Sequence, residues 1–178
     1  FTSGHISDIN LKRLIKAINA FKLIMKVHNI LFYKAFATSA LREASNKKYV
    51  LKKVLEKCKV KIEIIDGEKE AMIISKSNTS SIISPDKIFL SIDVGGGSTE
   101  FSVLKEGKTI SSKSFKLGTI RLLNNTVSDQ VWGEVKKWIL ENIKNYNKIT
   151  LVGSGGNINK IFSLSNTKEG KPLSRIKF

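Results

Sequence analysis

The sequence predicts an α/β protein, and three observations lead to that class. The first part of the chain alternates between helix and strand periodicity, which is the element order of an α/β domain. The second part begins with three short strands in succession, which predict a meander. A glycine-rich turn at residues 153–156 then separates a further strand from a further helix.

The apolar spacing of the first part defines its elements. A helix is expected from Ser7 to about Val27, because apolar residues recur there at helical intervals behind a capping serine. The nearly continuous apolar run at residues 30–37 predicts a buried strand. A second helix is expected after that strand, through about Lys57.

Two more elements and a loop complete this part. Residues 59–65 alternate apolar and charged side chains, which is a strand pattern, and a turn leads into a helix over about residues 68–75. The polar stretch 76–86 is expected to be a loop or hinge. It divides the chain into two expected domains, residues 1–80 and 81–178.

The second part contains the strands of the meander, predicted at residues 88–94, 99–104 and 108–116. A helix opens at Ser128, because the apolar residues after it share one face. A strand at residues 149–152 then leads to the glycine turn and to the start of another helix.

The composition favours a polyanionic partner. The chain has 31 Lys and Arg against 15 Asp and Glu, a formal net charge of +16. Such an excess attracts polyanions over a Debye length of about 8 Å at physiological salt. The basic residues are spread along the chain and only 8% of residues are aromatic, which argues against a nucleic-acid interface. A phosphate-rich substrate fits this composition, and a solvated basic surface without a partner is the alternative.

Cysteine usage and hydropathy indicate the compartment. Cys58 is the single cysteine, so a reducing environment is the simplest fit. No apolar stretch approaches the ~20 residues that cross a bilayer, and the first residues lack the order of a secretory signal. We therefore expect a cytoplasmic protein without a membrane partner, and a homodimer is compatible with the sequence.

The segment SIDVGGGSTE at residues 91–100 is the most informative motif. Its glycines allow positive φ and present bare N–H groups that can converge on a phosphate, and the adjacent hydroxyls add donors. Asp93 and Glu100 flank the turn and can offer hard oxygen ligands to Mg²⁺. A simple hairpin turn is the alternative, but it does not require an acid on each side. The predicted phosphate donors are Gly95, Gly96, Gly97, Ser98 and Thr99.

Three further segments can contribute to a phosphate site. The turn formed by Gly153, Ser154, Gly155 and Gly156 precedes a helix, whose N-terminus would add partial positive charge, although a tight turn without a ligand is the alternative.

Near residue 40, a strand ends in Thr38 and Ser39, whose hydroxyls can cap the next helix or bind a ligand. Arg42 lies just inside that helix, where a cation is unfavourable unless an anion neutralises it. Its guanidinium group can hold a phosphate through two hydrogen bonds. In the third segment, a carboxylate in the helix start at residues 67–71 can orient or deprotonate a water.

Five segments stand in a recognisable order: ATSALREASN at 37–46, IEIIDGEKEA at 62–71, LSIDVGGGSTEFSV at 90–103, LGTIRL at 117–122 and LVGSGG at 151–156. Together they strongly resemble the exopolyphosphatase and guanosine pentaphosphate phosphohydrolase (Ppx/GppA) family. The resemblance spans nearly the whole chain, and the segment around the three glycines is its most specific part.

The resemblance implies the actin-like, or ribonuclease H-like, fold, in which two α/β domains face each other across a cleft that holds phosphates. By the family pattern Glu70 resembles the catalytic glutamate that positions the attacking water. Asp93 and Glu100 match the acids around Mg²⁺ and the phosphates. Arg42 and residues 95–99 would bind phosphate, and the turn at 153–156 would line the far wall of the cleft.

The sequence also departs from the family pattern. The family begins with a strand carrying another phosphate loop, which does not precede Phe1, and its second domain continues past Phe178. We therefore expect both domains to be incomplete, in a fragment or in the ordered portion of something longer. Asn157 stands where the family commonly has threonine.

These observations predict a Mg²⁺-dependent exophosphatase that removes terminal phosphate from inorganic polyphosphate with a water held by Glu70. Such hydrolysis requires positioning and charge neutralisation more than covalent catalysis. Hydrolysis of guanosine pentaphosphate is the nearest alternative, because no base-reading motif decides between the two substrates. A kinase or chaperone-like ATPase would share the fold, and a fragment that binds polyanions without turnover would share the charge.

Overall fold

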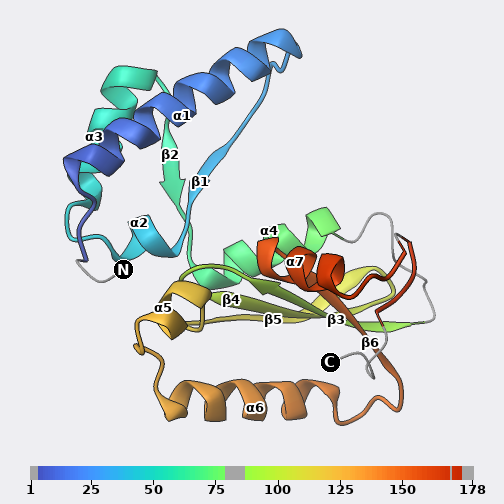
Figure 1. The fold of residues 1–178 in the computed structure, drawn as a ribbon. Helices are drawn as coiled ribbons and strands as arrows, with labels where there is room; N and C mark the ends of the chain where they lie inside the picture. The colour runs from blue at the N-terminus through green and yellow to red at the C-terminus, as the bar shows by residue number, and fades with distance from the viewer. Residues whose placement is uncertain (1–3, 79–86, 169, 174–178) are drawn as a thin grey trace. The chain divides into compact units, whose positions relative to one another are not determined.

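The computed structural model describes residues 4–78, 87–168 and 170–173, and Figure 1 shows their elements. The chain forms two compact units, Phe1–Asp66 and Gly67–Phe178. The helix that follows Asp66 packs on strands of the second unit, so the compact units divide before the expected boundary at residue 80. The ends of the two actin-like domains themselves stay a prediction.

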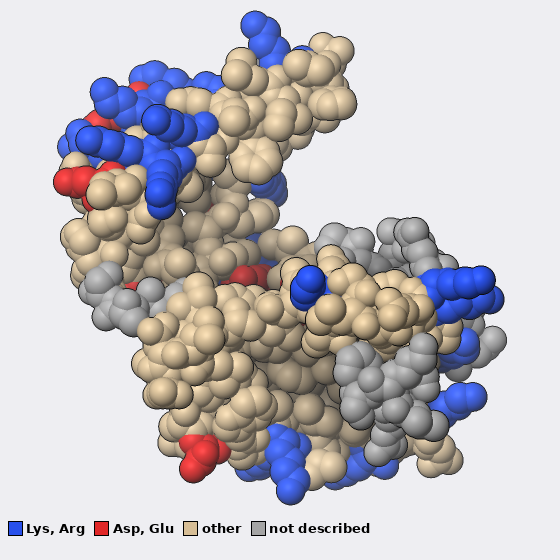
Figure 2. Space-filling model, viewed as in Figure 1, with Lys and Arg blue, Asp and Glu red and all other residues tan. Residues whose placement is uncertain are grey.

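The first unit packs helices on a short parallel pair of strands. Its core contains Val50, Val54 and Cys58, which are fully buried. Figure 2 shows Lys and Arg gathered over its two long helices, whose polar faces are solvated. The elements are α1 (Asp8–Val27), β1 (Ala35–Ala37), α2 (Ser39–Glu43), α3 (Lys47–Cys58) and β2 (Ile62–Ile64), with β1 parallel to β2.

The first helix begins as predicted, because Ser7 caps α1 and its hydroxyl accepts a hydrogen bond of 3.3 Å from the N–H of Asn10. Two other expectations need correction. The predicted strand at residues 30–37 is reduced to β1, because β2 offers it only three residues to pair with.

The predicted second helix is divided into α2 and α3. At the break, the Asn46 side chain accepts a hydrogen bond of 3.0 Å from the N–H of Ile6 and donates one of 2.9 Å to its carbonyl. The segment before α1 is thereby tied to the junction between the two helices.

The second unit is built on a four-stranded sheet of order β5-β4-β3-β6. The meander prediction is confirmed, since β3 pairs antiparallel with β4 and β4 with β5, and β6 then runs parallel to β3. The elements are α4 (Gly67–Asn78), β3 (Ile88–Val94), β4 (Thr99–Lys105), β5 (Lys108–Phe115), α5 (Thr119–Leu123), α6 (Asp129–Ile143), β6 (Ile149–Ser154) and α7 (Gly156–Leu164).

Helices cover both faces of this sheet, α4 and α7 on one face and α6 on the other (Figure 1). On the α6 side, Trp138 of α6 packs edge to face with the rings of Phe101 and Phe115, with centroids 5.5 to 6.2 Å apart among the three rings. The opposite face carries polar side chains at the same depth, including the buried Ser102 and Glu100. This polar face is where the candidate site lies.

Three differences from the predicted elements concern the second unit. Helix α4 extends to Asn78, and the remainder of the expected loop, residues 79–86, lies outside the described residues. Strand β6 extends to Ser154, and α5 was not predicted. Among the helices in the described ranges, not one combines the length and the apolar character needed to cross a membrane.

Candidate active site

Four polar residues form a row across the sheet face under α4 and α7. Asp93 pairs with Glu100 on β4 and with Ser154 on β6, and Glu100 pairs in turn with Ser114 on β5. Residues paired directly across strands project to the same face, so this register places the two acids side by side. The structure thus brings together the two residues predicted to hold a metal.

Helix α4 adds a third carboxylate to this row. It begins at Gly67, where a Cβ atom would lie 2.9 Å from Oγ of Ser114, so only glycine lets the helix start so close to β5. Glu70 follows one turn later and is only 8% exposed. Its negative charge acts on Glu100, which shows that the predicted catalytic residue and the predicted metal ligands share one region of the second unit.

The environment of Glu100 disfavours its ionised form. Burial is the main reason that the pKa of Glu100 is raised above its ordinary value, and the negative charges of Glu70 and Asp93 raise it further. Hydrogen bonds from Ser98 and Ser114 oppose this shift, the second with 2.7 Å between Oγ of Ser114 and Oε1 of Glu100. A cation beside these carboxylates would relieve their repulsion.

The donor set fits Mg²⁺. Hard carboxylate oxygens from Asp93 and Glu100 on neighbouring strands are the type of ligand that Mg²⁺ takes, usually one or two of them with water and substrate phosphates. In the described part of the chain, no group of three or more His, Cys, Asp and Glu side chains forms a cage of its own. An ion here would therefore complete its coordination with water or substrate.

The glycine turn joins β3 to β4, and the N–H of Gly95 donates to the carbonyl of Ser98 at 3.0 Å. The expected use of positive φ is wrong for Gly95 and Gly96, neither of which is in the left-handed region. A Cβ at position 96 would lie 3.0 Å from Cδ1 of Ile120, so a larger residue there would require that side chain to shift slightly. The glycine turn is thus in contact with α5.

The hydroxyls beside the turn are engaged within the protein. Thr99 donates from Oγ1 to the carbonyl of Leu117, and the Ser98 side chain bonds to Glu100. Both residues are buried. These hydrogen bonds fix the start of β4. That Ser98 and Thr99 bind phosphate stays a prediction.

The turn at the end of β6 reaches the same row. Gly155 has φ +97°, and a Cβ there would lie 2.9 Å from Oδ1 of Asp93 and from the carbonyl of Val94. The hydroxyl oxygen of Ser154 is buried and, within the described residues, makes no hydrogen bond. Gly153 and Gly156 complete the turn into α7, so this predicted segment does lie beside Asp93.

The other predicted phosphate ligands belong to the first unit. Arg42 in α2 donates from Nη1 to the carbonyl of Ile65 at 2.7 Å, which ties the helix to the end of β2. Thr38 makes no side-chain capping bond, and Ser39 is buried. The phosphate-binding role of these three residues stays a prediction.

Sequence reasoning missed Ser114 and the residues of α5. Ser114 is one of several serines in β5, and only the register shows that it meets Glu100. Gly118, just before α5, belongs to a segment that resembles the family, but the sequence predicted no role for it. Its Cβ would lie 2.6 Å from the N atom of Gly97, so that segment packs directly on the glycine turn.

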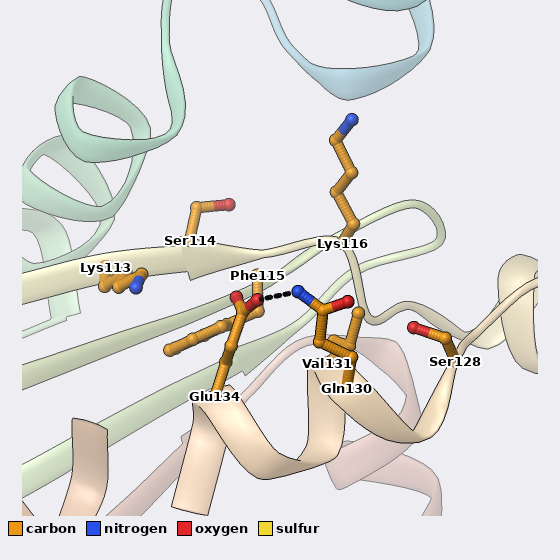
Figure 3. Close-up of a pocket in the computed structure, with 8 residues that line it drawn as sticks. All are labelled: Lys113, Ser114, Phe115, Lys116, Ser128, Gln130, Val131 and Glu134. Carbon is orange, nitrogen blue, oxygen red and sulfur yellow. Dashed lines mark hydrogen bonds between the residues drawn. The ribbon is translucent and has the colours of Figure 1, made fainter. Parts of the chain in front are cut away.

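A separate pocket of about 320 Å³ lies between β5 and the start of α6 (Figure 3). Within it Gln130 donates from Nε2 to Oε1 of Glu134 at 3.1 Å. The lining residues are Lys113, Ser114, Phe115, Lys116, Ser128, Gln130, Val131 and Glu134. None of the three carboxylates of the row lines it, so this pocket is not the candidate active site.

Known proteins are similar to this chain in sequence. The chain is 37% identical over 146 residues to a bifunctional 3-dehydroquinate synthase/phosphatase of Fusobacterium nucleatum, covering 75% of this chain and 21% of that protein. It is 30% identical over 128 residues to exopolyphosphatase 1 of Mycobacterium tuberculosis, covering 72% of this chain and 37% of that protein. The chain thus spans well under half the length of these relatives.

Solved structures confirm the predicted α/β fold. An exopolyphosphatase from Cytophaga hutchinsonii superposes with a TM-score of 0.81 at 25% identity, over 92% of this chain and 56% of that one. The Aquifex aeolicus Ppx/GppA protein superposes with a TM-score of 0.68 at 23% identity, over 98% and 58%. The model of the Ppx/GppA phosphatase family matches residues 2–168, and the chain therefore belongs to that family.

Proposed function

We propose that the protein hydrolyses the terminal phosphoanhydride bond of inorganic polyphosphate, with Glu70 positioning the attacking water. The observation that carries this proposal is the convergence of Glu70, Asp93 and Glu100 in one compact unit, where two of the acids act electrostatically on the third. The relatives named exopolyphosphatase support polyphosphate as the substrate class.

The reaction needs one base and many donors. The carboxylate of Glu70 orients a water molecule and takes a proton from it as the water oxygen bonds to the terminal phosphorus. The bond from that phosphorus to the bridging oxygen breaks, so the products are orthophosphate and a chain shorter by one phosphate. Backbone N–H groups of the glycine turn bind the oxygens of the terminal phosphate, in the bound substrate as in the transition state.

Asp93 and Glu100 would hold Mg²⁺ in this proposal. When bound, the ion supplies positive charge that neutralises the phosphate oxygens. The two carboxylates are suited to this role because their register fixes them side by side, and because a bound cation would offset the negative charge that Asp93 exerts on Glu100.

The charge of the protein supports a polyanionic substrate. Twelve Lys and two Arg precede residue 67, against five acidic residues, so the first unit carries a net charge of +9. A polyphosphate chain is attracted to such a surface through its repeated negative charges. The exposed basic residues of α1 and α3 (Figure 2) are Lys12, Arg13, Lys16, Lys26, Lys48, Lys52 and Lys57.

The direct test is phosphate release by the wild type and by two matched variants of α4. Glu70→Gln should lower kcat on polyphosphate by roughly 10²- to 10⁴-fold, the usual contribution of a positioned general base. Glu68→Gln makes the same change at an exposed position of the same helical turn and should retain activity. Full activity in Glu70→Gln would remove the assignment.

The same assay decides the substrate. Polyphosphate and guanosine pentaphosphate are compared at equal concentration of terminal phosphate, with Mg²⁺ and with a chelator. Faster release from polyphosphate in the presence of Mg²⁺ supports the proposal. Preference for guanosine pentaphosphate would transfer the same chemistry to the other substrate of the family, and binding without release would indicate a polyanion-binding protein.

A further inference from the structure

The three carbonyl groups of the glycine turn are all occupied by one short segment. Three successive residues at the start of α5 supply the donors, in the same order as the acceptors. The hydrogen bonds run from the N–H of Thr119 to Gly95 at 3.0 Å, from the N–H of Ile120 to Gly96 at 2.9 Å, and from Nε of Arg121 to Gly97 at 2.6 Å.

This pairing decides which side of the turn a ligand meets. Carbonyl oxygens repel an anion, and here all three are directed toward α5. Within the described residues the N–H groups of Gly96 and Gly97 donate to no protein acceptor. Consecutive N–H groups of this kind form a concave site for an anion. The contacts with α5 therefore occupy the carbonyl acceptors of the turn and leave its N–H donors available to a ligand.

Arg121 differs from the other two donors because it acts through its side chain. The bond to Gly97 is charge-assisted, which makes it stronger than an ordinary amide bond, and a cation also suits the last turn of α5. Gly118 makes the approach possible, since any Cβ there would collide with Gly96 and Gly97. The third carbonyl thus depends on one guanidinium.

We propose that Arg121 is a positioning residue that holds the glycine turn in its anion-binding arrangement, and so sets the affinity of the protein for a terminal phosphate group. This inference rests on the proposed function, because it assigns the anion to the substrate. Arg121 contacts the turn from behind, so its loss should weaken phosphate binding while leaving the water-activating carboxylate in place. The expected signature is a higher KM with little change in kcat.

The binding test uses tripolyphosphate as the probe, in a Glu70→Gln background where turnover is prevented. Isothermal titration calorimetry with Mg²⁺ should show that Arg121→Met weakens binding about tenfold, as expected for the loss of a charge-assisted hydrogen bond. Lys105→Met is the matched control, because it removes a positive charge from an exposed position of β4, where the ammonium lies 4.0 Å from the Glu106 carboxylate. It should change the affinity less than about twofold.

A second variant keeps the test valid if Arg121→Met folds poorly. Arg121→Lys retains the charge but has no Nε–H at the position that meets Gly97, so it should also weaken binding if the hydrogen bond is what matters. Full rescue by lysine, or unchanged affinity in Arg121→Met, would overturn the inference. So would a fall in kcat with an unchanged KM.

A measurement without substrate separates this inference from the proposed function. ¹⁵N relaxation should show the Gly96 and Gly97 amides as ordered in the wild type, with order parameters near ~0.85, and below ~0.6 in Arg121→Met. Rigid amides in both proteins would refute the positioning role even if polyphosphate is hydrolysed. A wild type that neither binds nor hydrolyses polyphosphate would refute the proposed function, and with it the link to affinity.

Discussion

Ser114 on β5 donates a hydrogen bond of 2.7 Å to Oε1 of Glu100 on β4. The two residues face each other in the antiparallel ladder, beneath the start of α4. The bond favours the ionised form of a carboxyl group whose pKa is raised by burial and by two neighbouring acids. Glu100 is therefore balanced between opposing influences, and its titration is accessible to experiment.

The contribution of Glu100 to the stability of the protein without Mg²⁺ should fall as pH rises. Its folded pKa lies above the ordinary value of 4.5, so the folded state binds more protons than the unfolded state between those two values. The contribution is fully present below pH 4.5 and is lost as pH rises through the folded pKa. Urea unfolding of the wild type and Glu100→Gln should show this, with the wild type losing stability relative to the variant from pH 4 to 8. A constant difference would contradict it.

Replacement of Ser114 by alanine should move this effect to higher pH. Without the hydroxyl the ionised carboxylate loses a donor, so the pKa of Glu100 should rise further. The loss of stability with pH should then extend further upward, by about 1.4 kcal/mol for each added pKa unit. Ser111→Ala, on the same strand but the opposite face, is the control. Identical pH profiles for the two variants would argue against the assignment.

Two glycine substitutions should change stability in opposite directions. Gly118→Ala places a Cβ 2.5 Å from the carbonyl carbon of Gly96 and should cost roughly 1–3 kcal/mol in free energy of unfolding, as overpacking does. Gly133→Ala, in α6, meets nothing within 4 Å and should stabilise the protein by roughly 0.5–1 kcal/mol. Thermal or urea unfolding measures both, and equal effects would mean that α5 does not pack on the turn as described.

Addition of Mg²⁺ should raise the melting temperature at pH 7, because an ion that binds only the folded state stabilises it. The rise should be smaller in Asp93→Asn, which removes one of the two carboxylates. Asp129→Asn, at the exposed start of α6, should keep the full rise. An equal rise in all three proteins would place the ion elsewhere.

The KM for long-chain polyphosphate should increase several-fold between about 0.05 and 0.5 M salt, because screening shortens the reach of the basic surface. The kcat should change little, since the buried carboxylates are screened less. Steady-state kinetics over a salt series tests this. A salt-independent KM would mean that the net charge of +16 has no part in substrate capture.

Most of the second unit could be predicted because local signals agree there with the tertiary structure. The strands of the meander are bounded by turns, and their apolar residues alternate toward α6. Glu70, Asp93 and Glu100 stand at element ends, where family resemblance implies their roles, and the register then shows Asp93 beside Glu100. The sequence could not show which side chains contact these acids. Ser114, for example, bonds to Glu100 but has no distinguishing local pattern.

The first unit was harder because its elements depend on partners. The apolar run at residues 30–37 predicts one strand, yet only Ala35–Ala37 pair, since a strand forms only where another is aligned with it. The helix expected through Lys57 is interrupted because Asn46 bonds to the backbone of Ile6, far earlier in the chain. This contact between distant parts of the chain is not visible in the local sequence pattern.

The close approach of Gly67 to Ser114 links two positions far apart in sequence by a constraint on size. A side chain at position 67 could be accommodated only if position 114 became smaller or α4 moved away from β5, and such a movement would carry Glu70 with it. Evolutionary change at either position should therefore be accompanied by change at the other. Family members with a bulkier residue at position 67 should show a compensating glycine opposite it, or a displaced helix.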